Sequence, residues 1–559
     1  MTPIQNQVYV LVLSGESSGA SKFVAARYPD CKSFFLSKRE LREGGWRGQI
    51  RAFRRLKGKA LVFYRESLEE IQEPQLALWT AALHRCRYTV SADANGRTLV
   101  NTRWTLIRSL PRAVVSAVTD IFVFSLTLFL LGMVRRKKAQ TPVQFQWRSE
   151  ADPELTYLYP YPLDKSIAGG ALSHVKGFLG GWLLAGNSCE VFSGKPLAAH
   201  NFPFHMIPAK RQLFLFHESK LLSYNLRFVL AVRKRLRNRK PGALYQRHGR
   251  FVYAGALLSK LLQVPFILEY NGSEAWMADH WDPARFGPWL RLCEEVSISR
   301  ADLIVVVSEP LKQELLQRGI DENRILVNPN GVDPLAFQPE CGGETVRAQM
   351  GFAHSDVVVG FIGTFHYWHG VKVLGQAIQQ LCTDRTAESV ASKLKFVLMG
   401  DGLLRAEMME SLKPFIGAQV FFTGVLPHSD VGAHLDAADI LVSPHVPMPD
   451  GRPFFGSPTK IFEYMAMAKG IIASDLDQLS RVLTHRRNAW LVKPGNATEL
   501  QAAIVLLAQN PKLRGELGEN ARSTVIAEHT WQQNAERVLA CIGARAPVKS
   551  ASIVDARSA

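Results

Sequence analysis

One stretch of this sequence decides the fold: Phe454-Phe455-Gly456-Ser457-Pro458-Thr459-Lys460-Ile461-Phe462-Glu463-Tyr464-Met465-Ala466-Met467-Ala468-Lys469-Gly470-Ile471-Ile472-Ala473-Ser474. The run Gly456-Ser457-Pro458 predicts a loop that begins a helix, with Ser457 as its cap and Pro458 at the first helical position. The helix should end near Ala468, before Gly470. A short buried strand follows over 471–473.

The start of this helix is suited to a phosphate group. A helix N-terminus offers unpaired backbone N–H groups and a partial positive charge. Lys460 adds a full charge there, and Glu463 lies about one turn further, where its carboxylate can reach a sugar hydroxyl beside the phosphate. The stretch therefore predicts a site for a nucleoside diphosphate, and the plain alternative is an ordinary amphipathic helix of an α/β domain.

The pattern Ser-Pro-x-Lys-x-x-Glu-Tyr-Met-Ala, followed by a glycine and a strand, resembles the donor-site helix of family-4 retaining glycosyltransferases, which have the GT-B fold. The resemblance implies that Glu463 holds the ribose of a sugar nucleotide. That family places a second glutamate eight positions earlier, where this chain has Phe455. Asp450, in the polar loop just before, is our candidate to do part of that glutamate's work.

Composition limits the class of protein. The chain has 559 residues, 47% of them hydrophobic and 21% charged, which predicts a globular protein of several domains. The net charge of +18 suits an anionic partner such as nucleic acid, an acidic lipid surface or a phosphorylated substrate. The seven cysteines show no metal-binding or disulfide spacing, which favours a reducing compartment. We see no cleavable signal peptide.

The N-terminal part is predicted to be a small α/β domain over residues 1–105. A buried strand over 8–13 is followed by Gly15, Gly19 and Lys22, which resemble a phosphate loop. The spacing fails the Walker pattern, because no Gly-Lys-Ser/Thr closes it. We assign no role to this domain.

Residues 113–134 form an apolar stretch of spanning length with a single charge, Asp120. Basic residues lie on both sides: Arg108 and Arg112 before it, and the tetrabasic run 135–138 after it. Three interpretations stay open. A single span would put residues 1–105 outside the cell, a re-entrant or in-plane helix would keep everything inside, and a core helix would not touch a membrane.

From residue 155 onward, strands and helices alternate, as in doubly wound parallel sheets. Predicted strands in the first half lie over 155–159, 190–193, 213–216, 243–246, 266–269 and 303–308. A glycine loop with Gly169 and Gly170 opens the first helix, and by the resemblance it faces the donor phosphates. Asn271 follows a strand end, where open α/β sheets bind ligands. Relatives often have a histidine there, whereas Asn271 can only hydrogen-bond.

In the second half, strands are predicted over 357–363, 396–402, 420–424 and 439–444. The loop after the first of these contains Gly363, Thr364 and His369, where relatives usually place an arginine and a lysine on the diphosphate. Lys460 is expected to compensate for this smaller charge, and His369 predicts a pH dependence near the ordinary range of histidine. By the resemblance, the nucleotide base lies near Gly424. The residues expected to act on the reacting groups are Lys460, Asn271 and Asp450.

The full prediction is an α/β protein with the GT-B fold: two Rossmann-like domains facing a cleft, preceded by a small α/β domain and one hydrophobic membrane helix. The predicted parts are 1–105 accessory domain, 106–138 membrane helix with basic flanks, 139–152 linker, 153–335 acceptor-side domain, 336–530 donor-binding domain, 531–545 helix crossing back, and 546–559 disordered tail. The basic run 233–240 predicts contact with an anionic membrane or a solvated helix face.

The expected function is a membrane-associated retaining glycosyltransferase. It would move a sugar from a nucleoside diphosphate donor to a lipid-linked or cell-surface glycan acceptor, with no metal or other cofactor and no nucleic-acid partner. Its place would be the inner (cytoplasmic) membrane, with the catalytic domain facing the cytosol. Two alternatives stay open: a GT-B epimerase or hydrolase, and a catalytically weak protein that only binds sugar nucleotides.

Overall fold

The computed structural model describes residues 6–13, 17–36, 45–65, 68, 83–135, 155–162, 170–197, 201–209, 213–383 and 392–542. Two compact units form: one from Met1–Met133 with Ala209–Arg227, the other from Val134–Pro208 with Phe228–Ala559. The predicted linker 139–152, the predicted tail 546–559 and Gly169 lie outside the described residues.

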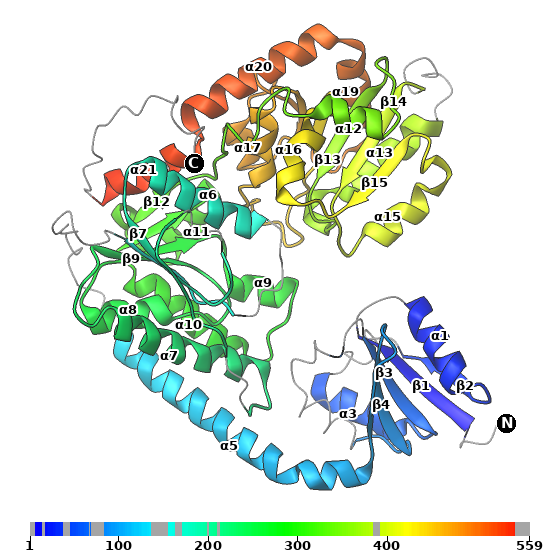
Figure 1. The fold of residues 1–559 in the computed structure, drawn as a ribbon, viewed down its shortest axis with the longest axis vertical. Coiled ribbons are helices and arrows are strands. Elements are labelled where there is room, and N and C mark those ends of the chain that lie inside the picture. Colours follow the sequence, from blue (N-terminus) through cyan, green and yellow to red (C-terminus); the bar gives the residue numbers. More distant parts are fainter. Residues whose placement is uncertain are drawn as a thin grey trace. The chain divides into compact units, whose positions relative to one another are not determined.

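The first unit contains a five-stranded sheet in the order β2-β1-β3-β4-β5 (blue in Figure 1). Its strands are β1 (Gln7–Val12), β2 (Lys32–Phe35), β3 (Ala60–Arg65), β4 (Tyr88–Asp93) and β5 (Thr98–Asn101), and only β5 is antiparallel to its neighbour. Helices α1 (Ser17–Arg27) and α3 (Gly45–Arg55) belong to the same unit. Successive residues of β1 face opposite sides of the sheet, so Val10 and Leu11 enter two separate apolar clusters. The predicted small α/β domain is confirmed.

Helix α5 (Arg103–Val134) continues from this sheet and contains the predicted apolar stretch. Among the described residues, one helix is long and apolar enough to cross a membrane, over Ile107–Val134, and its most apolar window has a mean hydropathy of 2.2. Only 28% of its most apolar window is buried within the protein. A core helix would be mostly buried, so this low buried fraction disagrees with the interpretation of the stretch as a core helix.

The second unit contains a parallel seven-stranded sheet in the order β12-β11-β10-β9-β6-β7-β8. The strands are β6 (Leu155–Tyr159), β7 (Cys189–Ser193), β8 (Phe204–Met206), β9 (Ala243–Arg247), β10 (Phe266–Tyr270), β11 (Leu303–Val306) and β12 (Ile325–Val327). The helices are α6 (Gly170–Leu184), α7 (His217–Arg235, shared with the first unit), α8 (Ala254–Leu262), α9 (Glu274–His280), α10 (Gly287–Arg300) and α11 (Glu309–Gln317).

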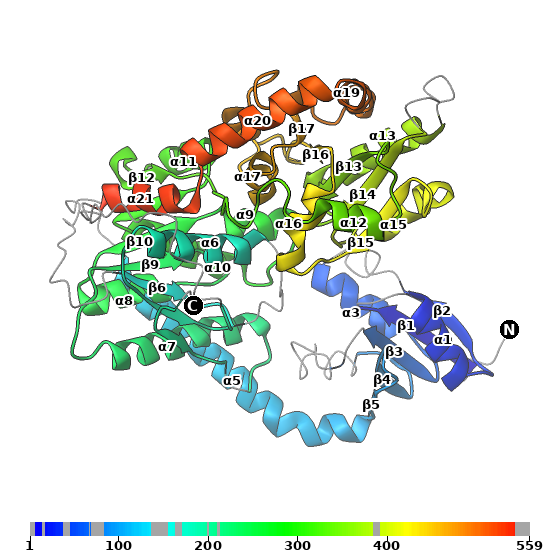
Figure 2. The ribbon, with the colours of Figure 1, turned by 45° about the horizontal axis from the view of Figure 1, so that its top comes forward.

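A parallel six-stranded sheet follows in the order β15-β14-β13-β16-β17-β18. Its strands are β13 (Val357–Ile362), β14 (Leu394–Met399), β15 (Val420–Gly424), β16 (Ile440–Ser443), β17 (Gly470–Ser474) and β18 (Trp490–Val492). Its helices are α12 (Gly343–Gln349), α13 (Val371–Thr383), α15 (Arg405–Ser411), α16 (His428–Asp436), α17 (Thr459–Ala466), α18 (Leu479–Val482), α19 (Ala497–Gln509) and α20 (Pro511–Glu528) (Figure 2). Two Rossmann-like sheets in series confirm the predicted fold class.

The last helix, α21 (Trp531–Cys541), packs against α6 of the seven-stranded sheet (Figures 1 and 2). Two glycines of α6 make this approach possible. A Cβ atom on Gly177 would lie 2.1 Å from the Trp531 ring, and one on Gly181 would lie 2.0 Å from the Trp531 carbonyl oxygen. The last described helix therefore connects the six-stranded sheet back to the seven-stranded sheet.

Two details of the sequence prediction are wrong. Residues 213–216 form no strand, and β8 at Phe204–Met206 completes the sheet instead. Helix α17 begins at Thr459, and its N-cap is Pro458. No side chain of the described residues, Ser457 included, caps the first N–H groups of this helix. The helix ends at Ala466, because Ala468 adopts a left-handed conformation (φ +55°) and Gly470 already belongs to β17.

Candidate functional site

A pocket of about 730 Å³ lies where the carboxyl ends of the strands of both larger sheets meet. The seven-stranded sheet contributes the start of α6, residues after β9 and β10, and Asn330 after β12. The six-stranded sheet contributes the loop after β13, the end of β14, Val425 with Leu426, and the start of α17. Open α/β sheets bind ligands at such strand ends.

The loop after β13 is held close to the end of β14 by glycine. A Cβ atom on Gly400, whose φ is +124°, would lie 2.0 Å from the carbonyl oxygen of Gly363. A Cβ atom on Gly363 would lie 3.0 Å from the Lys460 ammonium. Side chains at these two positions would therefore displace the loop or the lysine from the pocket wall.

Lys460, in the first turn of α17, is only 5% exposed and lies in the pocket wall. Its Nζ is 2.9 Å from Nδ1 of His369 and 4.5 Å from the centre of the Phe361 ring. Burial lowers the pKa of Lys460 to about 7, although Glu463 acts in the opposite direction. Among the described residues, no carboxylate makes an ion pair with this lysine, so it is a cation site without its own anion.

His369 and His445 surround this lysine with uncharged imidazoles. The rings of His369 and His445 lie 5.0 Å apart, and His445 shares a 3.0 Å hydrogen bond with the Ser443 hydroxyl. Burial and the Lys460 charge hold the pKa of both histidines well below the ordinary range. The expected pH dependence of His369 near its ordinary pKa is therefore wrong, and its Nδ1 is an acceptor for Lys460.

Glu463 lies one turn beyond Lys460 on α17 and lines the same pocket. Its side chain is buried, and burial raises its pKa to about 7 against the opposing charge of Lys460. In the part of the chain that the structure describes, its carboxylate has neither an ion pair nor a side-chain hydrogen bond. A buried carboxylate left in this way can accept bonds from ligand hydroxyls.

The opposite wall of the pocket carries a cluster around Glu269 at the end of β10. Its carboxylate pairs with Arg247, accepts a 2.7 Å bond from the Asn271 amide and lies 2.9 Å from Nε2 of His174. Burial alone would raise the pKa of Glu269, but His174 and Arg247 outweigh it and lower the pKa to about 2. Arg247, Asn271 and His174 all line the pocket.

Asn330 joins the two walls. Its Oδ1 lies 2.6 Å from Nδ1 of His174, and its side-chain amide donates to the carbonyl of Ser457, just before α17. Its backbone N–H donates to the Ser457 hydroxyl at 3.1 Å. Ser457 therefore connects the start of α17 to the seven-stranded sheet, which explains why it does not cap α17.

The structure brings most of the predicted site residues together. Those in the pocket wall are Gly170, Asn271, Gly363, Thr364, His369, Ser457, Pro458, Lys460 and Glu463. Gly424 lies one residue before the wall at Val425, and its carbonyl accepts a 2.7 Å bond from Gly400. Gly169 lies outside the described residues.

Asp450 is not part of this wall, so our expectation that it replaces the missing glutamate is wrong. Its carboxylate accepts a 2.7 Å bond from the Trp276 indole and pairs with Arg452 at 3.1 Å. Desolvation alone would raise the pKa of Asp450, but the bonds from Trp276 and Arg452 together outweigh it and lower the pKa. Asp450 therefore ties α9 to the loop before α17 and lies outside the pocket wall.

Sequence reasoning missed several residues of the wall, among them His174, Arg247 and Asn330. Arg247 directly follows a predicted strand, so its position at a sheet edge was a usable signal. His174 and Asn330 carried no such signal, because their roles depend on contacts across 156 positions of sequence. Among the described residues, no group of three or more His, Cys, Asp or Glu could hold a metal ion.

Comparison with known families gives two adjacent matches. Residues 168–334 match the model described as Glycosyltransferase Family 4, and residues 356–510 match the model described as Glycosyl transferases group 1. Together these ranges contain the pocket walls built from the two larger sheets.

Curated relatives are distant. The chain is 25% identical over 284 residues to TuaC of Bacillus subtilis, a glycosyltransferase assigned to teichuronic acid biosynthesis; this covers 51% of the chain and 65% of TuaC. It is 26% identical over 252 residues to a D-inositol 3-phosphate glycosyltransferase of Corynebacterium jeikeium, which covers 44% of the chain and 58% of that protein. The chain thus spans less than two thirds of the length of either relative.

Solved structures show the same fold. Anabaena HepE, crystallised with UDP and glucose, superimposes with a TM-score of 0.55 at 17% identity, covering 70% of the chain and 100% of HepE. Sucrose-phosphate synthase from Thermosynechococcus elongatus superimposes with a TM-score of 0.53 at 19% identity, covering 69% of the chain and 96% of the synthase.

Proposed function

Because this chain belongs to the family-4 glycosyltransferases of the GT-B fold, we propose that it transfers a sugar, with retention of anomeric configuration, from a nucleoside diphosphate sugar bound in this pocket. The acceptor is a lipid-linked or cell-surface glycan. The observation that carries the proposal is the pair Lys460 and Glu463 on α17. Both are buried in the pocket wall, and both lack a counter-charge bonded to them among the described residues.

This pair fits a sugar nucleotide. An ammonium kept without an anion favours a ligand that brings its own negative charge, as a diphosphate does. The start of α17 adds unpaired N–H groups beside it, and the start of α6 lies next to it, since a Cβ on Gly170 would be 3.7 Å from Thr459 Oγ1. A ribose beside that diphosphate places its hydroxyls at the free carboxylate of Glu463.

The transfer itself relies on positioning and electrostatics. The departing diphosphate gathers negative charge, and Lys460 with the two helix starts stabilises it. A phosphate oxygen accepts the proton of the attacking hydroxyl, which then bonds to the face of the sugar that the diphosphate leaves. Asn271 donates to Glu269 and leaves its amide oxygen for a sugar hydroxyl. In this proposal no metal ion or other cofactor takes part, so activity should survive a chelator.

We further propose that the protein works at the cytosolic face of the inner membrane. The exposed apolar helix α5 supports contact with lipid, and the basic side chains in and after the last turn of α7 support contact with anionic headgroups. Arg233, Lys234 and Arg237 are exposed there, whereas Arg239 pairs with buried Glu190. A nucleotide sugar is made in the cytosol, so the pocket must open there.

A second candidate function is sugar-nucleotide binding without transfer. It is favoured by Thr364 and His369, which leave the loop after β13 with no fixed positive charge, and by Phe455 in place of a glutamate. A third candidate is a sugar-nucleotide epimerase or hydrolase, which would consume the donor without an acceptor.

The experiment is a melting-temperature panel of nucleoside diphosphate sugars, followed by turnover with the best one. A donor at about 100 times its dissociation constant adds roughly 2.7 kcal/mol to the free energy of unfolding. Transfer to a membrane extract, with the product anomer identified by NMR, supports the proposal. Binding without donor consumption supports the binding protein, and consumption without a glycan product supports the hydrolase or epimerase.

A further inference from the structure

We propose that α5 lies in the plane of one phospholipid leaflet and does not cross the membrane. This inference rests on the membrane association proposed above, and it decides which of two membrane geometries the helix adopts. Helix α5 up to Met133 and the segment Ala209–Arg227 belong to the same compact unit.

One face of α5 is apolar and uncovered. From residue 113 to 134 the sequence has one charge, Asp120, and that side chain is buried. The exposed large side chains on this part of the helix are between 46% and 67% exposed: Val114, Val115, Val118, Ile121, Phe122, Leu128, Phe129 and Met133. Soluble monomers rarely expose so many adjoining apolar residues, and such a patch marks a membrane or protein contact.

The opposite face of α5 is covered by protein, and it carries three polar side chains beside the buried Val123 and Leu131. Ser116, Asp120 and Thr127 are all at most 2% exposed, and their spacing of four and seven residues places them on one side of a helix. The Asp120 carboxylate accepts a 3.0 Å bond from the backbone N–H of Leu215. Between residues 113 and 134 the helix thus buries its one charged side chain against protein and leaves most of its large apolar side chains exposed, which is unlike a surface helix in water.

The bond between Leu215 and Asp120 is incompatible with a single span. Asp120 is seven residues from Ala113, so in a spanning helix it would lie about 10 Å inside the hydrocarbon. Leu215 would lie there too, although residues 213–216 have irregular backbone and the charged Glu218 and Lys220 follow within five positions. Irregular lipid-exposed backbone does not occur in the hydrocarbon core.

An in-plane helix meets each of these conditions. Its apolar face enters the acyl region, while the Asp120 face and the Leu215 segment remain on the aqueous side. At its N-terminal end, Trp104, Arg108 and Arg112 are exposed, and such residues favour the headgroup level.

A second copy of the chain is a poorer occupant of this face. Neighbouring residues Val114 and Val115, and again Ile121 and Phe122, are exposed in pairs. At about 100° per residue, such pairs widen the apolar face well beyond the narrow seam of a coiled-coil contact. A broad, featureless apolar arc is what a leaflet requires, and the net charge of +18 opposes self-association.

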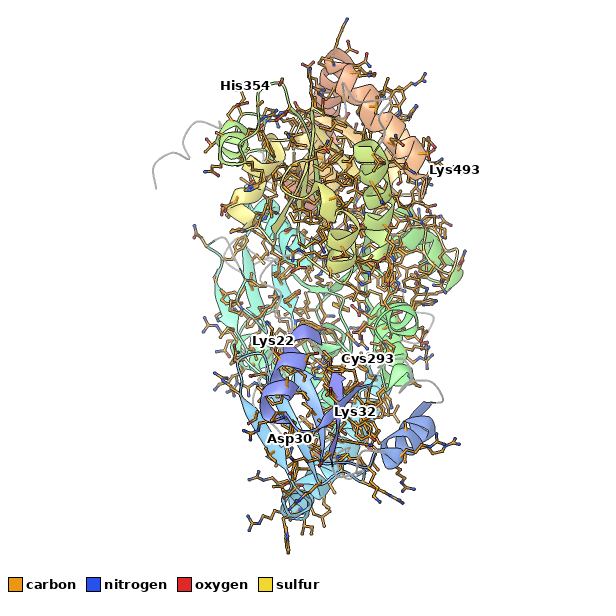
Figure 3. The ribbon with its side chains drawn as sticks, turned by 90° about the vertical axis from the view of Figure 1, so that its right-hand side faces the viewer. Lys22, Asp30, Lys32, Cys293, His354 and Lys493 are labelled. Atoms are coloured by element: carbon orange, nitrogen blue, oxygen red, sulfur yellow. The ribbon has the colours of Figure 1, made fainter. Side chains whose placement is uncertain are left out.

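The orientation of α5 can be tested by measuring from which side of the membrane each half of the chain reacts with a labelling reagent. Lys22 on α1 and His354 before β13 are exposed positions labelled in Figure 3. Each is replaced by cysteine in the full-length chain, after serine replaces the four cysteines that are at least partly exposed: Cys31, Cys341, Cys382 and Cys541. Inside-out and right-side-out vesicles are then treated with a membrane-impermeant maleimide.

An in-plane helix predicts that Lys22→Cys and His354→Cys both react in inside-out vesicles and that neither reacts in right-side-out vesicles. Reaction of the two positions in opposite vesicle types means that α5 spans the bilayer, which overturns the inference and leaves the proposed membrane association intact. A chain that stays in the soluble fraction overturns both the inference and the membrane association.

A binding measurement checks that the exposed face makes the contact. The double variant Phe122→Ser, Phe129→Ser removes two large exposed rings and should lower partitioning into phospholipid vesicles about 100-fold or more. The matched control is Leu335→Ser with Leu403→Ser, two leucines that are 70% and 67% exposed elsewhere. Equal partitioning of the two double variants would contradict the assignment of this face to lipid.

Discussion

Replacing Lys460 with methionine should make the protein more stable and a worse binder of its donor. The methionine has a similar length, and it keeps the apolar contact with the Phe361 ring, which the lysine ammonium now faces at 4.5 Å. It removes the charge that is buried in the pocket wall without an ion-paired carboxylate among the described residues. A residue kept for function at the expense of stability should behave in this way.

The magnitude follows from the pKa of Lys460, which burial lowers from 10.5 to about 7. That difference is about 3.5 pH units, and each unit corresponds to about 1.4 kcal/mol, so the buried charge costs at most about 5 kcal/mol. The variant leaves Nδ1 of His369 without its donor, which costs about 1–3 kcal/mol. We therefore expect a net gain of roughly 2 kcal/mol in the free energy of unfolding at pH 7.

The pH dependence has a definite sign. Between about pH 7 and the pKa of the unfolded chain, the unfolded state binds one more proton at this lysine than the folded state does. The free energy of unfolding contributed by Lys460 therefore rises with pH over that window. The Lys460→Met variant should lose this rise, because it has no group to titrate there.

The assay is urea unfolding of both proteins from pH 6 to pH 9, with calorimetric titration of the donor found in the panel. The matched control is Lys469→Met, which removes a lysine three residues after α17 that pairs with Asp436 at 3.1 Å. The control should lower stability slightly and leave donor affinity unchanged. If Lys460→Met is less stable than the native chain, or binds donor equally well, the assignment of this lysine as an unneutralised phosphate site is refuted.

Four further outcomes are expected. Glu463→Gln should weaken donor affinity ten- to a hundredfold in calorimetry while the melting temperature holds, since it loses a charge-assisted bond of about 1.5–3 kcal/mol; an unchanged affinity would remove Glu463 from the ribose. Asn330→Ala should lower both stability and turnover, because it leaves buried polar partners unsatisfied at about 1–3 kcal/mol; unchanged turnover would show that the link between the two walls is dispensable. Donor affinity of the native chain should fall up to tenfold per pH unit above about pH 7, as Lys460 loses its proton; a flat profile to pH 9 contradicts this. Asp450→Asn should change donor affinity by less than about twofold, because its carboxylate serves Trp276; a large loss would return Asp450 to the site.

Much of the fold was predictable from the sequence because the parallel strands are buried on both faces and appear as short apolar runs. The predicted strand 155–159 matches β6 residue for residue, and β15 at Val420–Gly424 does as well. The run 213–216 was misread for the same reason. It is equally apolar, but it lies in the loop that supports Asp120, and no local pattern distinguishes the two.

The candidate site was partly predictable. The start of α17 is a local feature, so Lys460 and Glu463 could be placed on one helix face from their spacing alone. The lowered pKa of His369 could not be predicted, because it results from burial in the folded chain and from the charge of Lys460, 91 positions away. The predicted role of Ser457 as a helix cap is wrong for a similar reason. Its hydroxyl accepts a bond from the backbone N–H of Asn330, which comes from the other sheet, and not from an N–H of α17.

The central claim is that this pocket transfers a sugar, and one measurement tests it most directly. Membranes containing the native chain or Lys460→Met are incubated with radiolabelled donor from the panel, and label is counted in the lipid-extractable and polymer fractions. The account predicts label in one of these fractions for the native chain and a loss of at least tenfold for the variant. Donor that is bound tightly by the native chain, yet never leaves its sugar in either fraction, would contradict it.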